Sequence, residues 1–191
     1  MTSNDQATHQ SLADWIGDIV ALESHVEEAL DRQLTLESGD TNVAIAFKRY
    51  HDTVRDSKRR ALAYQKGYGS TSGNPIIKAG SNLLGKAAGM IDKMRNDSAS
   101  KAMRDDYTAF NHLAISYTML HATALAMHDD ATSTFALEGL TTYSGLVQDV
   151  NHLIGNAVIA ELRANDDQPD VDDSVVAKVR ENIDATWKTT S

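Results

Sequence analysis

Glu23 is the residue whose type and position are most suggestive of chemistry in this sequence. It lies in the segment DWIGDIVALESHVEEAL (residues 14–30), in which apolar residues recur with helical spacing, and a helical wheel places Glu23 near the middle of the apolar side. A carboxylate in an apolar interior either takes up a proton or finds a cation. Glu23 therefore predicts either a buried ion pair or hydrogen-bonded network that fixes the helix register, or a metal site.

Two basic residues are candidates to neutralise Glu23. The first two expected helices are antiparallel about a turn near Gly39, which places residues 54–58 level with Glu23. Lys58, or Arg55 at the edge of the apolar side, can then reach the carboxylate. We expect this ion pair in preference to a metal ligand, because a dinuclear carboxylate site needs several inward acids and only one is visible.

The metal alternative depends on histidine. A reduced mononuclear site could use Glu23 and His121 as ligands, with His51 as a further candidate, and could handle iron or peroxide. Helical wheels also place Tyr50, Tyr117 and Tyr143 among the apolar residues, and we expect the first two to join the polar network. The complete expected interior polar network is Glu23, Tyr50, His51, Arg55, Lys58, Tyr117 and His121.

A second pattern has the spacing of a metal-binding pair. Asp149 and His152 form an acid-x-x-His motif, as found in metal sites between helices. On the wheel, however, the motif lies away from the apolar side of its helix, and His152 is nearly opposite that side. We therefore expect Asp149 and His152 to lie on a solvated face.

Composition excludes several classes of function. The chain has 191 residues, a net charge of −9 and a pI near 5.1, so nucleic acid is not an expected partner. Zero cysteines exclude disulfides, zinc ribbons and thiolate catalysis. The sequence has no apolar run of about 18 residues and no secretory signal pattern, so we expect a cytoplasmic protein without membrane contact. No catalytic residue and no small-molecule substrate can be assigned.

The elements that must position these residues are all helical, because apolar residues recur at intervals of three and four. We expect four long helices paired by short turns, with one long helical crossover, which is a ferritin-like four-helix bundle. Ser98 is the expected N-cap of the third long helix. We expect residues 1–8 to be disordered, residues 9–165 to form the bundle, and residues 166–191 to form a linker and a short helix. The expected helices cover residues 9–37, 42–66, 75–94 (the crossover), 99–128, 133–165 and 173–188.

Three segments resemble a known family. IGDIVALESHVEEAL, YHDTVRD and FNHLAISYTML are similar to the first, second and third helices of the bacterial YciE/YciF-type ferritin-like proteins, and the resemblance covers residues 15–165 in order. It implies a ferritin-like fold, a role in stress responses and metals between the helices. Glu23 matches an acidic position of that family. Its other metal-binding positions correspond here to Asp52 and Arg55, to Asn111 and Ala114 (or, shifted by one residue, Phe110 and Leu113), and to Gln148 and Asp149.

Because most of these positions carry no metal ligand, we expect a degenerate site with no cofactor. The expected function is that of a non-enzymatic, stress-associated or scaffolding bundle that self-associates, as a dimer for example. One alternative is residual binding of iron, manganese or zinc, or peroxide handling, at Glu23 and His121. Another is a partner-binding module that uses the C-terminal helix, whose apolar side carries Val175, Val179, Ile183 and Trp187.

Overall fold

The computed structural model describes residues 3–72, 98–164, 171–172 and 174–189, and within these residues the chain is helical with no strands. The all-α prediction is thus confirmed. The predicted crossover helix at residues 75–94 lies outside the described residues. The described helices are α1 (Ser3–Gln33), α2 (Thr41–Ser72), α4 (Ala99–Ala126), α5 (Asp130–Arg163) and α6 (Ser174–Thr189).

The helix boundaries follow from local capping. Ser98 is the N-cap of α4, as predicted, and its side chain accepts a hydrogen bond from the amide of Lys101. Asp129 caps α5 in the same way, so that helix begins three residues before the predicted start. Gly39 has a φ of +66° in the turn between α1 and α2, a conformation that favours glycine. Helix α1 begins at Ser3, six residues before the predicted start.

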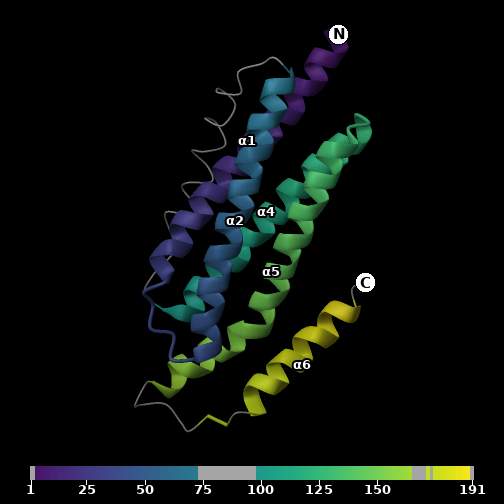
Figure 1. Cartoon of the computed structure of the whole chain (residues 1–191). Helices are drawn as coiled ribbons and strands as arrows, with labels where there is room; N and C mark the ends of the chain where they lie inside the picture. The colour runs from purple at the N-terminus through teal and green to yellow at the C-terminus, as the bar shows by residue number, and fades with distance from the viewer. Residues whose placement is uncertain (1–2, 73–97, 165–170, 173, 190–191) are drawn as a thin grey trace.

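The four long helices lie side by side in two antiparallel pairs, α1 with α2 and α4 with α5 (Figure 1). Helices α2 and α4 run in the same direction, although they follow each other in the chain. Side-chain contacts agree with this arrangement: Tyr64, late in α2, meets Thr132 at the start of α5, while Gln33 at the end of α1 meets Asp106 near the start of α4. Residues distant in sequence are thus brought to the same level of the molecule.

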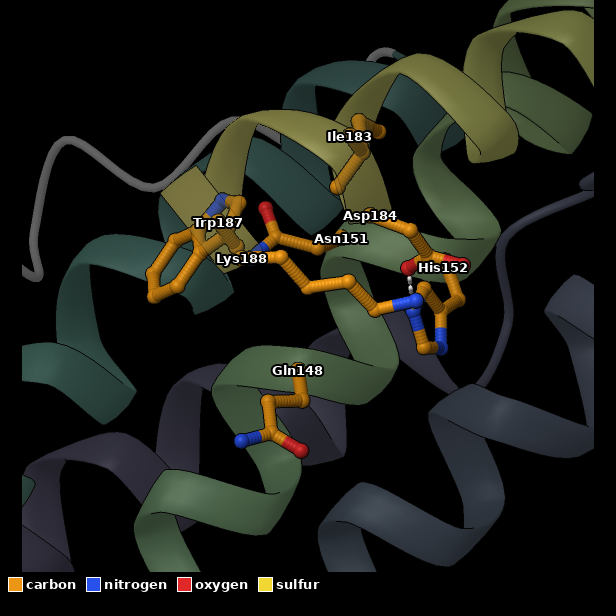
Figure 2. A pocket seen from close by; sticks show the side chains of 7 residues that line it. All are labelled: Gln148, Asn151, His152, Ile183, Asp184, Trp187 and Lys188. Carbon is orange, nitrogen blue, oxygen red and sulfur yellow. Dashed lines mark hydrogen bonds and ion pairs between the residues drawn. The ribbon is translucent and has the colours of Figure 1, made fainter. Parts of the chain in front are cut away.

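Helix α6 packs along α5, outside the four long helices (Figure 1). His152 of α5 lies 2.9 Å from Asp184 of α6, and Arg180 donates a hydrogen bond to the backbone carbonyl of His152. Figure 2 shows the pocket of about 280 Å³ between the two helices, with Trp187 at its edge. No helix in the described residues is long and apolar enough to cross a membrane.

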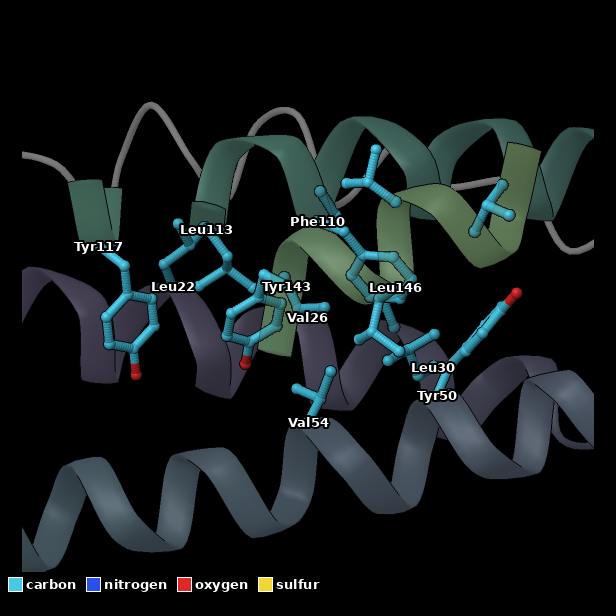
Figure 3. Packing of buried hydrophobic residues seen from close by; sticks show 14 of the residues in the cluster. Leu22, Val26, Leu30, Tyr50, Val54, Phe110, Leu113, Tyr117, Tyr143 and Leu146 are labelled. Atoms are coloured by element: carbon cyan, nitrogen blue, oxygen red, sulfur yellow. The ribbon is translucent and has the colours of Figure 1, made fainter. Parts of the chain in front are cut away.

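One hydrophobic core joins α1, α2, α4 and α5. Its largest fully buried side chains include Tyr50, Tyr117, Tyr143 and Phe110. Figure 3 shows these rings in a row between the helices, with aliphatic side chains packed around them. The core is therefore rich in tyrosine, and each tyrosine hydroxyl placed inside it needs a hydrogen-bond partner.

Candidate functional site

Glu23 is fully buried and is the point where the four long helices meet. One of its carboxylate oxygens, Oε1, accepts three hydrogen bonds: from Ser57 of α2 at 2.7 Å, from Tyr117 of α4 at 2.9 Å, and from Tyr143 of α5 at 2.8 Å. We call these four residues the Glu23 cluster. It links α1 to each of the other three long helices through a single oxygen atom.

The electrostatics of the Glu23 cluster balance burial against hydrogen bonding. Burial raises the pKa of the Glu23 carboxyl above its usual range, while the hydrogen bonds from Ser57, Tyr143 and Tyr117 and the positive charge of Arg60 lower it in part. Burial and the negative charge of Glu23 together raise the pKa of both tyrosines. The two phenols therefore remain protonated hydrogen-bond donors across the physiological range. The other Glu23 oxygen, Oε2, is buried without a hydrogen-bond partner.

Gly139 of α5 makes room for this arrangement. A Cβ atom at that position would lie 2.2 Å from the ring of Tyr117, so only glycine lets the ring lie flat against the helix. A small depression beside the ring is lined by Ser57, Arg60, Phe135 and Glu138 as well as by Tyr117 and Gly139. The Glu23 cluster is thus separated from solvent by the Tyr117 ring and the side chains around it.

The prediction that Lys58 or Arg55 pairs with Glu23 is wrong. Lys58 pairs with Glu27, and Arg55 pairs with Asp52 and Asp56. The reason is helical geometry, because consecutive residues differ by about 100° around the helix axis. Ser57 faces inward and presents a short hydroxyl to Glu23. Lys58 points to the edge of the interface, where Glu27, one turn beyond Glu23, is within its reach.

The remaining residues of the predicted polar network lie in separate places. Tyr50 donates a 2.6 Å hydrogen bond to Asp149, which also pairs with Arg49. His51, which is mostly buried, lies 3.7 Å from both Asp31 and Asp52. Of the predicted residues, only Tyr117 bonds to Glu23.

His121 does not share a partner with Glu23. Its Nδ1 lies 3.0 Å from the backbone carbonyl of Ser133 and 3.1 Å from the Ser133 hydroxyl. Nδ1 donates to the carbonyl in one tautomer and accepts from the serine hydroxyl in the other, so Ser133 occupies this nitrogen in both. Within the described residues, no group of three or more histidine, aspartate or glutamate side chains is placed to hold a metal ion.

The Asp149-x-x-His152 motif splits between two environments. His152 is exposed, as expected, and pairs with Asp184. Asp149 is half-buried, and its role is to accept the hydrogen bond from Tyr50. The prediction of a solvated face is therefore right for His152 and incomplete for Asp149.

Asp106 is a second buried acid that sequence reasoning missed. It is fully buried in α4, and its Oδ1 accepts a 2.8 Å hydrogen bond from the side-chain amide of Gln33. Burial raises the pKa of Asp106 to about 8. A sequence signal was present, because Asp106 lies one turn before Phe110 on the apolar side of α4. Ser57 was missed for a similar reason: it lies between Val54 and Ala61 at helical spacing.

Comparison of the chain with protein-family models, with curated proteins and with solved structures gave no match. Its function must therefore be inferred from the arrangement of its own residues.

Proposed function

We propose that the chain is a ferritin-like four-helix bundle in which the Glu23 cluster replaces a metal centre as the structural centre of the interior. The observation that carries this proposal is the convergence of three hydroxyl donors, from three helices, on Glu23 Oε1. A carboxylate that accepts several hydrogen bonds is stabilised without a cation. The cluster thus accounts for a buried acid mainly through hydrogen bonding, with a smaller contribution from the charge of Arg60.

The connectivity supports the ferritin-like part of the proposal. Two antiparallel pairs are joined by the segment 73–97, and the helices on either side of it, α2 and α4, run in the same direction. A long connection between the second and third helices is the feature that distinguishes ferritin-like bundles from simple up-and-down bundles. The resemblance to the YciE/YciF-type family, with its role in stress responses, and the cytoplasmic location remain expectations from the sequence.

The donors around Glu23 do not fit a dinuclear metal centre. Such a centre needs about four to six carboxylate or imidazole ligands. The three groups that touch Glu23 Oε1 are protonated hydroxyls, and the raised pKa values of the two tyrosines disfavour the phenolate form that a metal would prefer. We therefore assign the Glu23 cluster a structural role and derive no step through a metal ion.

Metal binding tests this role. The protein is refolded with excess iron, manganese or zinc, dialysed, and analysed for bound metal beside a Glu23→Gln variant. We expect both proteins to retain the same sub-stoichiometric amount. Stoichiometric binding by the wild type that the variant loses would overturn the proposal, and would favour the alternative metal site of Glu23 and His121.

A surface feature favours self-association as the function that this bundle serves. No Asp, Glu, Lys or Arg occurs from residue 107 to residue 128, a span that covers most of α4. Helical spacing places four exposed residues of this span in one line, which we call the α4 stripe: Ile115, Met119, Ala122 and Ala126. Because the chain has a net charge of −9, two copies repel each other least where they meet over an uncharged surface.

Analytical ultracentrifugation over a range of concentrations tests this association. We expect a dimer that Met119→Glu converts to a monomer. The matched control is Ile45→Glu, because Ile45 is 57% exposed on the charged helix α2 and Met119 is 41% exposed. A wild-type monomer at all concentrations, or equal effects of the two substitutions, would contradict a role for the α4 stripe.

A further inference from the structure

Five of the six tyrosines lie in one continuous line of aromatic contacts through the core. One end of this line, from Tyr117 through Tyr143 and Phe110 to Tyr50, is visible in Figure 3. We call the whole line the tyrosine chain. Its successive ring-centroid distances are 5.4 Å for Tyr50–Phe110, 6.4 Å for Phe110–Tyr143, 5.7 Å for Tyr143–Tyr117, 5.9 Å for Tyr117–Phe135, 4.2 Å for Phe135–Tyr64 and 6.2 Å for Tyr64–Tyr68.

The inner tyrosines of this chain are hydrogen-bonded to carboxylates. Tyr117 and Tyr143 both donate to Glu23, and Tyr50 donates to Asp149. A phenol that loses an electron becomes a strong acid, so it is oxidised most easily when a hydrogen-bonded base can take its proton at the same time. Ordinary packing of aromatic rings does not require a carboxylate at each of these hydroxyls.

Tyr64 has the same connection through one intermediate. Its hydroxyl lies 2.8 Å from the hydroxyl of Thr132, which in turn donates a 2.8 Å hydrogen bond to Asp129. Because the Thr132 hydrogen points to Asp129, Tyr64 must be the donor in the first hydrogen bond. A proton leaving Tyr64 can thus pass through Thr132 to Asp129.

The exposure of the side chains differs along the tyrosine chain. Tyr64 and Tyr68 are half-buried, whereas Tyr117 and Tyr143 are at most 1% exposed. An oxidant in solution therefore meets the Tyr64 end first. Two phenols share the Glu23 carboxylate inside the core, where bulk water and other radicals do not reach them.

We propose that the tyrosine chain carries a one-electron oxidation from Tyr64 at the surface to Tyr117 and Tyr143, where it is held as a buried tyrosyl radical. In the first step an oxygen-centred radical takes one electron from Tyr64 and becomes an anion, while the Tyr64 proton moves through Thr132 to Asp129. In the second step Tyr117 gives an electron to Tyr64 by way of the Phe135 ring. Asp129 then returns its proton to Tyr64, and the Tyr117 proton moves to Glu23.

The resting state is restored by a small thiol in solution. The thiol gives one electron to the tyrosine chain at Tyr64, releases its proton to water and leaves as a thiyl radical. Glu23 then returns its proton to Tyr117, so that no atom of the protein is consumed. This activity goes beyond the structural role of the Glu23 cluster, since it uses the same carboxylate as a proton acceptor.

Photochemical oxidation followed by electron paramagnetic resonance tests the proposal. The full chain is oxidised by one electron with a photogenerated ruthenium(III) tris-bipyridine complex and frozen after increasing delays. We expect a tyrosyl radical in the wild type that decays at least about tenfold more slowly than in Glu23→Gln, because the amide of the variant cannot take up the phenolic proton as a carboxylate can. A lifetime that is equal in the two proteins would overturn the proposal.

Three further variants test whether the long-lived radical depends on the tyrosine chain itself or only on the burial of tyrosine side chains. The double variant Tyr117→Phe/Tyr143→Phe should lose the long-lived signal, and Phe135→Leu should lower its yield by interrupting the path from Tyr64. Tyr107→Phe is the matched control, because Tyr107 is the tyrosine outside the chain, and it should leave the signal unchanged. Circular dichroism establishes that each variant is folded. A long-lived radical that persists in the double variant, or that disappears in Tyr107→Phe, would contradict the assignment.

Discussion

Two buried carboxylates at different levels of the same core show two ways of keeping an acid in an apolar interior. Glu23 and Asp106 both have 0% exposure, and they lie on helices α1 and α4, which pack against each other. Glu23 directs one oxygen at three hydroxyl donors, whereas Asp106 receives one hydrogen bond, from Gln33. Burial raises the pKa of both groups, and the number of donors determines how far hydrogen bonding offsets that rise.

Asp106 is the acid that keeps its proton. Its pKa of about 8 makes the neutral form dominant near neutral pH. Two buried acceptor atoms, Asp106 Oδ2 and Gln33 Oε1, have no hydrogen-bond partner. A proton on Oδ2 turns one of these acceptors into a donor, so protonation reduces the number of unpaired buried acceptors. Glu23 also has one unpaired oxygen, Oε2, but the three donors on its Oε1 oppose the rise in pKa that burial causes.

The largest effect is expected from removing the Glu23 side chain. Glu23→Ala leaves the hydroxyls of Ser57, Tyr117 and Tyr143 without their acceptor and opens a cavity between four helices. We expect the free energy of unfolding, measured by urea denaturation, to fall by about 3–5 kcal/mol. The control is Glu28→Ala on the same helix, where an exposed pair with Arg32 is lost and the change should stay within about 0.5 kcal/mol. Equal effects at the two positions would mean that the three hydrogen bonds contribute little.

The second prediction concerns pH and Asp106. The pKa of this acid rises from 3.8 to about 8 in the folded chain, so the folded state binds a proton that the unfolded state has released. The resulting stabilisation is complete below pH 3.8 and is lost as the pH rises toward 8. Asp106→Asn does not titrate and preserves the shape of the side chain. Its unfolding free energy relative to the wild type should therefore increase by roughly 3–4 kcal/mol between pH 5 and pH 8.

Urea titrations of both proteins at several pH values measure this difference. Glu181→Gln is the control, since Glu181 forms an exposed pair with Lys178 on α6 and has no contact with the Asp106–Gln33 pair, and the loss of an exposed pair changes the unfolding free energy little. Parallel pH profiles for Asp106→Asn and the wild type would show that Asp106 is ionised in the folded chain. The contrast between the two buried acids would then disappear.

Sequence patterns predicted the helices well because the formation of each helix depends on residues close together in the sequence. Apolar spacing and the cap at Ser98 gave the all-α class, and the wheel placed Glu23 in the core. The partners of Glu23 depend on information that a wheel lacks. A wheel gives the direction of a side chain but not its reach, so Lys58 was preferred over Ser57. It also counts tyrosine as apolar, so Tyr143 was placed in the core without a role for its hydroxyl.

The sequence prediction lacks Asp106 because the apolar side predicted for this helix starts at Phe110, although the same helical line begins one turn earlier. Its partner Gln33 comes from the end of α1, 73 residues away, and no local pattern pairs the two. The tyrosine chain depends even more on tertiary structure, because its rings come from three helices. Each tyrosine is visible in the sequence, but the order of the rings follows from how the helices pack.

The smallest expected effect is that of Lys58→Met, and it distinguishes a hydrogen-bonded Glu23 from an ion-paired one. In the structure Lys58 pairs with Glu27, and both side chains are partly exposed, at 26% and 16%. Removal of the lysine should therefore cost no more than about 1 kcal/mol in unfolding free energy. If Lys58 neutralised Glu23 instead, the substitution would strand a buried charge and cost about 3–5 kcal/mol. The double variant Lys58→Met/Glu27→Gln shows which acid Lys58 neutralises. If stability recovers in the double variant, the loss in Lys58→Met came from stranding Glu27. If the loss is unchanged, it came from Glu23, and an ion pair with Lys58 would again explain the buried acid.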